Sequence, residues 1–202
     1  MTPAAVIVVP AVPTTFRWNG TPLSSAVEDD KVDITVGAGT DWFVDPRSGE
    51  TTLNTAALIG ALDGDFALSA RVEVTFQSTF DAGALVLWRD AATWAKLAFE
   101  YSPQGQPMVV SVVTRGESDD CNSMDISTGL VWLRIARLGA AYAFHASNDG
   151  TKWQFVRHFR LGPASPTEVG FEAQSPLGQG CAARFSDIVY SPHGPEDLRD
   201  GR

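Results

Sequence analysis

Short stretches of alternating apolar and polar residues recur along almost the whole chain, and this pattern constrains the fold more than any other feature. In WAKLAFEY, for example, Leu97, Phe99 and Tyr101 fall on one side of an extended strand, opposite Lys96 and Glu100. Turn residues separate such stretches about every 8–12 positions, which is typical of an all-β sandwich or barrel. The expected strands cover 30–37, 66–76, 83–90, 94–101, 107–115, 131–139, 141–149, 153–161, 167–175 and 181–190.

The segments between these stretches predict tight connections. An Asp-Gly pair in SNDGTKW (147–153) suits a two-stranded hairpin, and Gly139 is expected to close another. The segment SPQGQP (102–107) is expected to join two neighbouring strands. The one weak candidate for a helix is NTAALIGAL (54–62).

Length and composition indicate one globular domain. The chain has 202 residues, of which 44% are hydrophobic and 19% charged, so it has enough apolar surface to build a substantial core. We expect a single domain over 1–202, with its core at about 15–190 and flanking segments at 1–14 and 191–202.

The net charge and the N-terminus exclude several classes of partner. A formal charge of −9 argues against a nucleic acid or an anionic membrane surface, because both attract clustered Lys and Arg. The apolar run near the N-terminus has no preceding basic residues and is interrupted by Pro10 and Pro13, so it is a poor signal peptide and too short to span a bilayer. The sequence therefore predicts a soluble cytoplasmic protein.

No cofactor or metal is expected. Cys121 and Cys181 lack the CxxC spacing of a metal site, and the sequence leaves open whether they form a disulfide. The carboxylates in 118–120 have the oxygen ligands that Ca²⁺ takes, but without EF-hand spacing. The chain also lacks a G-x-S-x-G motif and a phosphate-binding glycine loop between a strand and a helix.

Five segments together resemble the regulation of enolase protein 1 family, which belongs to the concanavalin A-like lectin/glucanase superfamily. They are GTDWFVDP (39–46), FDAGALVLWRDAATWAKLAFEYS (80–102), VVSVVTRGESDD (109–120), VWLRIARLGAAYAFHASNDGTKW (131–153) and VGFEAQSPLGQGCAARFSDI (169–188). The resemblance covers roughly 15–190 in collinear order. It implies a concanavalin A-like jelly-roll β-sandwich of two antiparallel sheets, one of them with a concave face where superfamily members commonly bind carbohydrates and other ligands. It does not imply a reaction.

Sorting the strand residues by face gives the candidate ligand-binding residues. Those expected to point away from the core combine tryptophans, opposite charges and an amide, a mixture that suits a pocket for a polar ligand. They are Trp88, Lys96, Glu100, Trp132, Arg134, Glu172 and Gln174. The resemblance adds Asp41 and Trp42 as residues of the rim. The alternative interpretation is a solvated sheet face with cross-strand pairs, with Asp41 capping a turn and Trp42 closing one end of the sandwich.

A catalytic interpretation would use Glu100 and Glu172 as paired carboxylates, or Glu100 with Lys96 for proton transfer in an isomerisation or cyclisation. Related glucanases carry several acidic residues on one strand, and Lys96 stands where such a pattern requires an acid, which argues against conventional glucanase chemistry. We therefore expect binding of a carbohydrate or similar polar small molecule on the concave face. An enzyme using the same groove and a regulatory module that contacts another protein remain alternatives. The sequence leaves the ligand, any reaction and the oligomeric state open.

Overall fold

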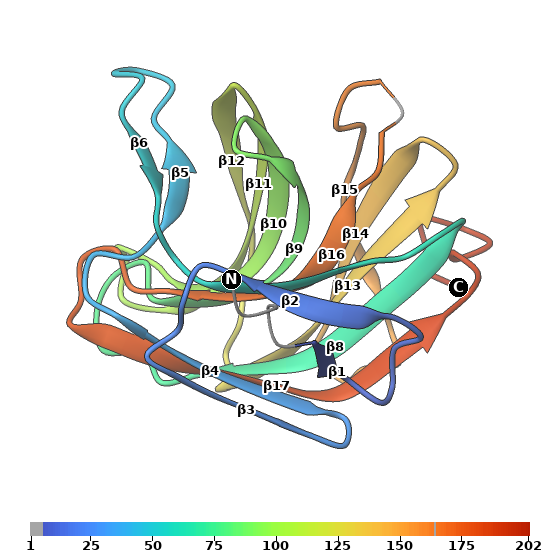
Figure 1. Ribbon diagram of the computed structural model, residues 1–202, viewed down its shortest axis with the longest axis horizontal. Coiled ribbons are helices and arrows are strands. Elements are labelled where there is room, and N and C mark those ends of the chain that lie inside the picture. The colour runs from blue at the N-terminus through green and yellow to red at the C-terminus, as the bar shows by residue number, and fades with distance from the viewer. Residues whose placement is uncertain (1–5, 164) are drawn as a thin grey trace.

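The computed structural model describes residues 6–163 and 165–202. These residues form strands and no helix, and the strands make two large antiparallel sheets packed face to face (Figure 1). The predicted all-β fold, a concanavalin A-like jelly-roll sandwich, is confirmed. No element of the described chain is a helix long and apolar enough to cross a membrane.

One sheet has eight strands and the other has seven. The eight-stranded sheet runs, in spatial order, β1 (Ile7–Val8), β2 (Thr15–Asn19), β7 (Ala57–Ala61), β16 (Glu168–Gln174), β9 (Ala82–Asp90), β10 (Thr93–Tyr101), β11 (Pro107–Arg115) and β12 (Glu117–Asp125). The seven-stranded sheet runs β15 (Gln154–Phe159), β14 (Ala141–Ser147), β13 (Leu130–Leu138), β8 (Phe66–Val74), β17 (Gly180–Ser191), β4 (Lys31–Gly37) and β3 (Ser24–Glu28). A separate hairpin pairs β5 (Trp42–Val44) with β6 (Thr51–Leu53).

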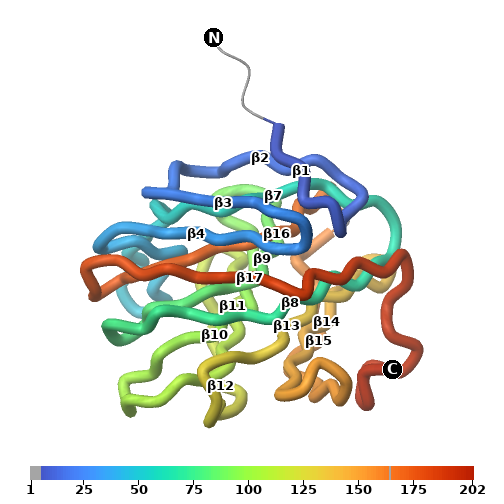
Figure 2. The backbone as a smooth tube through the Cα atoms, turned by 90° about the horizontal axis from the view of Figure 1, so that it is seen from below, coloured from blue at the N-terminus to red at the C-terminus, as the bar shows by residue number. Residues whose placement is uncertain are grey.

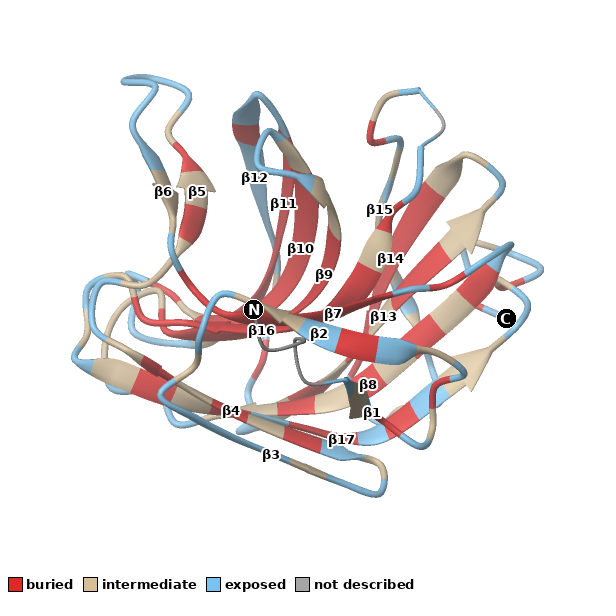
Figure 3. Cartoon of the chain, viewed as in Figure 1, coloured by how far each residue is buried: buried red, intermediate tan, exposed pale blue. Residues whose placement is uncertain are grey.

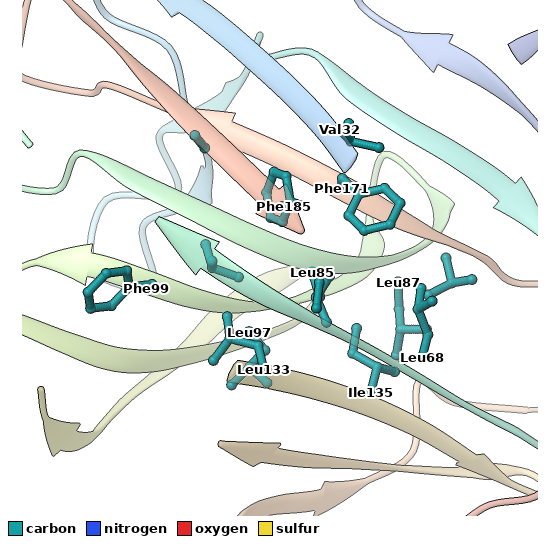
Figure 4. Close-up of a cluster of buried hydrophobic side chains, with 14 of the residues drawn as sticks. Val32, Leu68, Leu85, Leu87, Leu97, Phe99, Leu133, Ile135, Phe171 and Phe185 are labelled. Atoms are coloured by element: carbon teal, nitrogen blue, oxygen red, sulfur yellow. The ribbon is translucent and has the colours of Figure 1, made fainter. Parts of the chain in front are cut away.

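The main core lies between the two sheets. Leu97 of β10 and Leu133 of β13 lie in this core, as do Phe171 and Phe185, whose ring centroids are 5.1 Å apart (Figure 4). Figure 3 shows the resulting alternation of buried and less buried residues along β4 and β8. The core assignment made from alternation in WAKLAFEY is confirmed for Leu97 and Phe99, which are fully buried.

Strands β9, β10 and β16 differ, because nearly every residue along them is buried. One face of these strands packs on the seven-stranded sheet. A second apolar cluster covers the other face, and it includes Trp42 from the β5–β6 hairpin. A strand that is covered on both sides carries apolar residues on both sides. This explains why β9, β10 and β16 have few of the exposed polar residues that an ordinary surface strand carries on one side.

The predicted connections are confirmed. The 147–153 segment links β14 to β15, the 102–107 segment links β10 to β11, and Gly139 lies between β13 and β14. Gly139 and Gly150 have φ values of 59° and 72°, a left-handed conformation that glycine adopts at little cost.

Two local expectations differ from the structure, and the strands expected from the sequence also omit β1, β2, β3, β5 and β6. The segment 54–62 was the weak helix candidate, but it contains β7, which pairs with both β2 and β16. Strand β12 was not anticipated, because most of its side chains are polar and exposed, and its pairing with β11 alone makes it an edge strand. Both segments are strands because they pair with neighbouring strands, and the local sequence pattern does not reveal such pairing.

Both flanking segments contact the sandwich where they are described. Strand β1 adds to the sheet edge beside β2, while the first five residues of the expected N-terminal flank lie outside the described residues. The C-terminal segment lies beside β13–β15 (Figure 2), where the Leu198 carbonyl is 2.9 Å from His145 Nε2. Cys121 is exposed and Cys181 is buried, and both are free thiols.

The close approach of β7 to β16 generates a stability prediction. A Cβ at Gly170 would overlap the backbone carbonyl of Leu58, which cannot move without disturbing the sheet. We expect Gly170→Ala to lower the free energy of unfolding by about 1–3 kcal/mol or more, measured by urea denaturation. Gly129→Ala is the matched control, since nothing lies within 4 Å of its Cβ position and its effect should stay within about 0.5 kcal/mol. Equal effects of the two changes would contradict the prediction.

Candidate functional site

The candidate site lies on the face of the eight-stranded sheet that is turned away from the main core, here called the outer face. Register places Glu100 of β10 and Gln174 of β16 on either side of Ala82, and it places Glu172 of β16 beside Ala84. Figure 1 shows the β5–β6 hairpin standing beside β10–β12 on this side of the sheet. The sandwich therefore brings Lys96, Glu100, Glu172 and Gln174 together on one face, as alternation within their strands predicted.

Trp42 attaches the hairpin to the outer face. Its ring centroid lies 4.8 Å from that of Trp88 and 5.8 Å from that of Trp94, and its indole Nε1 donates a 3.3 Å hydrogen bond to the Thr55 carbonyl. Trp42 and Trp94 are buried, and Trp88 is half-buried. These tryptophans therefore pack on one another and hold the hairpin in place; Trp42 and Trp94 have no free face for a ligand.

Lys96 joins the hairpin to the sheet through polar contacts. Its side chain is 2% exposed, and its Nζ donates to Asp41 Oδ1 at 3.0 Å, to the Trp42 carbonyl at 2.8 Å and to Gln174 Oε1. Burial alone would lower the pKa of Lys96, but the nearby acidic groups, Asp41 foremost, outweigh burial and raise it. Lys96 is therefore a charged ammonium group, and each of its three protons is donated to an acceptor. It cannot act as a neutral amine base at neutral pH.

Glu172 is the most deeply buried acid of the site. It is 0% exposed, and neither carboxyl oxygen has a hydrogen-bond partner among the described residues. Burial raises the pKa of Glu172 to about 8, and nearby Asp41 and Glu100 act in the same direction while Lys96 opposes them. At neutral pH this carboxyl group is therefore mainly protonated.

Glu100 faces a pocket. It is 9% exposed, and burial raises its pKa to about 7, against the influence of Lys96. A carboxyl group with such a pKa exists in both protonation states near neutral pH, so it can accept or donate a proton. Lys96 forms its ion pair with Asp41 and not with Glu100.

The pocket has a volume of about 340 Å³ and lies between the hairpin and strands β10–β12. Apolar side chains form part of its wall, and polar groups from the hairpin, the sheet and one loop converge on it. Its lining residues are Asp41, Phe43, Phe80, Lys96, Glu100, Pro103, Gln104, Met108, Val110, Val112, Asp120, Asn122 and Gln174. Glu172 is absent from this lining, so of the two expected carboxylates only Glu100 reaches the pocket.

Four predicted ligand-binding residues do not line the pocket: Trp42 and Trp88 pack against each other on the outer face, and the other two lie on the other sheet. Trp132 and Arg134 belong to β13 of the seven-stranded sheet, so the expectation that they share the groove is wrong. The Arg134 guanidinium lies 4.3 Å from the ring centroid of Trp153, and Nη2 donates a 2.7 Å hydrogen bond to the Gly201 carbonyl. Alternation correctly sorted the faces of β13, but it does not tell which sheet a strand joins.

Sequence reasoning missed most of the pocket wall. Phe43 lies on the short hairpin, and Met108, Val110 and Val112 lie on β11, whose two apolar faces gave no alternation to sort. Phe80 has a φ of 69°, which is uncommon for a bulky residue and gives no local signal in the sequence. The sequence suggests Asp120 only as part of a possible Ca²⁺ site. The described residues contain no group of three or more His, Cys, Asp or Glu arranged to bind a metal ion.

The buried Glu172 gives a pH-dependent prediction. Its raised pKa means that the folded chain binds more protons than the unfolded chain between the ordinary value of 4.5 and about 8, so its contribution to the free energy of unfolding falls as pH rises through this window. Glu172→Gln is neutral at every pH, and we expect its stability relative to wild type to increase by a few kcal/mol from pH 5 to pH 8.5, at about 1.4 kcal/mol per pKa unit. Urea denaturation at both pH values measures this.

The control for that experiment is Glu28→Gln on β3, because Glu28 is an exposed carboxylate at an edge of the other sheet. Its stability difference from wild type should be nearly the same at both pH values. A pH-independent difference for Glu172→Gln as well would show that Glu172 titrates as an ordinary glutamate.

Comparison with known proteins gives relatives over most of the chain. Regulation of enolase protein 1 of Saccharomyces cerevisiae is 27% identical over 177 residues, which are 84% of this chain and 86% of the relative. The crystal structure of a functionally unknown protein from Saccharomyces cerevisiae has a TM-score of 0.80 at 25% identity and covers 87% of this chain and 95% of that one.

More distant structures share the fold alone. A GH43 protein from Bacillus licheniformis has a TM-score of 0.65 at 15% identity, covering 87% of this chain but 36% of its own. The xylan beta-1,4-xylosidase from Bacillus halodurans has a TM-score of 0.63 at 13% identity, and the match covers 83% of this chain and 38% of the xylosidase. A family model described as "Protein of unknown function (DUF1349)" matches residues 18–193. The resemblance to regulation of enolase protein 1 is thus confirmed, and the chain belongs to the DUF1349 family.

Proposed function

We propose that the protein binds a carbohydrate or a similar polar small molecule in the pocket between the β5–β6 hairpin and strands β10–β12. The observation that carries this proposal is Glu100, a largely buried carboxyl group that faces the pocket and forms no salt bridge within the described residues. Unlike the enclosed Glu172, the Glu100 carboxyl group opens to the pocket, so a ligand hydroxyl could form a hydrogen bond with it.

The pocket wall supports a ligand with both polar and apolar surfaces. Phe43 and Phe80 are half-buried and supply aromatic area, while Gln104, Asn122 and Asp120 supply groups for hydrogen bonds. A mostly apolar wall with a few convergent polar groups is the usual form of a small-molecule site, and 340 Å³ is near the lower end of the usual size. Sugar rings combine apolar faces with hydroxyl edges and match this wall.

The backbone at Phe80 also supports a binding role. A φ of 69° is unfavourable for a residue with a bulky side chain, yet here Phe80 N donates to the Tyr101 carbonyl and Phe80 O accepts a bond from Gln174 Nε2. These contacts hold the residue in a strained conformation beside the pocket. Such strain concentrates at functional sites, where it positions a side chain that the fold itself does not need there.

The main test is ligand binding followed by one substitution. We expect neutral monosaccharides and short oligosaccharides to include compounds that raise the thermal unfolding midpoint, since a ligand that binds only the folded state stabilises it. Glu100→Gln should weaken binding of the best compound roughly 10- to 100-fold in isothermal titration, the cost of losing a hydrogen bond to a charged group. Glu28→Gln should leave affinity unchanged. A screen in which no compound stabilises the protein would overturn the proposal.

A second candidate function is acid–base catalysis at the same site. The pKa of about 7 at Glu100 favours it, since a group with this pKa can remove and return a proton near neutral pH. This candidate predicts turnover of the bound compound, followed by nuclear magnetic resonance of the ligand. Glu100→Gln should abolish that turnover while measurable binding persists. A ligand that binds through Glu100 and stays chemically unchanged would contradict the catalytic candidate and would support binding without catalysis.

The name of the yeast relative refers to regulation of enolase, which is the one observation in favour of a regulatory role through a protein partner. Such a role would be insensitive to Glu100→Gln in both experiments.

A further inference from the structure

The pocket has a charge balance that restricts its ligand. Lys96 is the only positively charged residue among the described residues that line it, and its three protons go to Asp41, the Trp42 carbonyl and Gln174. An ammonium group has three protons to donate, so Lys96 has none left for a ligand. Its charge is also balanced at 3.0 Å by Asp41.

Two acidic groups of the pocket have no such counter-ion. Glu100 and Asp120 both line it, and neither takes part in a salt bridge within the described part of the chain. Glu100 is about nine-tenths buried, and burial raises its pKa; Lys96 opposes this shift, while the Asp41 and Asp120 charges add to it. The pocket therefore has acceptors and negative charge available, while its remaining donors are the neutral amides of Gln104, Asn122 and Gln174.

We propose that the ligand is a small polyhydroxylated amine, such as an amino sugar, whose ammonium group pairs with Glu100. This inference rests on the proposed function and names the ligand class of the same pocket. The ammonium would supply the positive charge that the pocket lacks, just as Lys96 does for Asp41. Phe43 and Phe80 add aromatic surface, which also attracts cations.

The same balance disfavours sugar acids and sugar phosphates. An anion in this pocket would find no free cationic group among the lining residues, and it would lie beside Glu100 and Asp120. Like charges in a partly dry site repel strongly, so an anionic ligand could enter only with a protonated Glu100. Neutral sugars lack this penalty but also lack the favourable pairing.

Matched sugars test the inference directly. Isothermal titration at pH 7 compares D-glucosamine, D-glucose and D-glucuronate, and then D-galactosamine, D-galactose and D-galacturonate. Within at least one series we expect the amine to bind roughly five- to tenfold more tightly than the neutral sugar, because a charged hydrogen bond replaces a neutral one. The uronate should bind more weakly than both.

Variants identify the group responsible. Glu100→Gln keeps the size of the side chain and removes its charge. In this variant the amine and the neutral sugar should therefore bind with nearly equal affinity. Glu28→Gln, far away on β3, should retain the full preference. Thermal unfolding of each variant without ligand checks that it is folded.

The outcomes separate this inference from the proposed function. If neutral sugars or uronates bind at least as tightly as the amines, the pocket binds carbohydrate and the amine preference is wrong. An amine preference that survives in Glu100→Gln would also overturn the inference, because the charge would then act elsewhere. If no sugar of either series binds while other compounds of the thermal-unfolding screen do, the amine inference is wrong and the proposed function stands.

Discussion

The arrangement of the outer face depends on one buried ion pair. Lys96 lies on β10, its counter-ion Asp41 and the Trp42 carbonyl lie on the hairpin segment, and its third acceptor belongs to Gln174 on β16. A lysine that is 2% exposed is tolerated only when its charge is paired and its protons are shared. Meeting that requirement fixes the hairpin against the sheet, and the hairpin in turn forms one wall of the pocket.

Glu172 and Glu100 lie on the same face of the sheet but differ in burial and in access to the pocket. Glu172 lies beside Ala57 and Ala84 and is fully enclosed, so it is mainly protonated and has no access to the pocket. Glu100 lies two residues beyond Ala98 on β10, and its carboxyl group reaches the pocket. Their chemical difference follows from what covers them, since both are glutamates on the same face of one sheet, with β9 between their strands.

The sequence predicted the fold class and the faces of the main strands, because period-two alternation reports directly on burial. It therefore placed Lys96, Glu100, Glu172 and Gln174 on a common face. It misassigned Trp132 and Arg134, because alternation within β13 contains no information on the sheet that the strand joins. The pocket wall contributed by Phe43 and Phe80 depends on a short hairpin and an unusual backbone conformation, which arise only from long-range contacts.

The lysine within WAKLAFEY changes what the site can do. Glycosidases that use paired carboxylates place two acids on either side of the scissile bond. Here Lys96 neutralises Asp41 and leaves Glu100 as the one deeply buried carboxyl group that reaches the pocket. A largely buried carboxyl group of pKa about 7 is suited to bind a donor or to transfer a proton. The other two acids of the pocket wall differ from it, because Asp41 is paired with Lys96 and Asp120 is exposed to solvent.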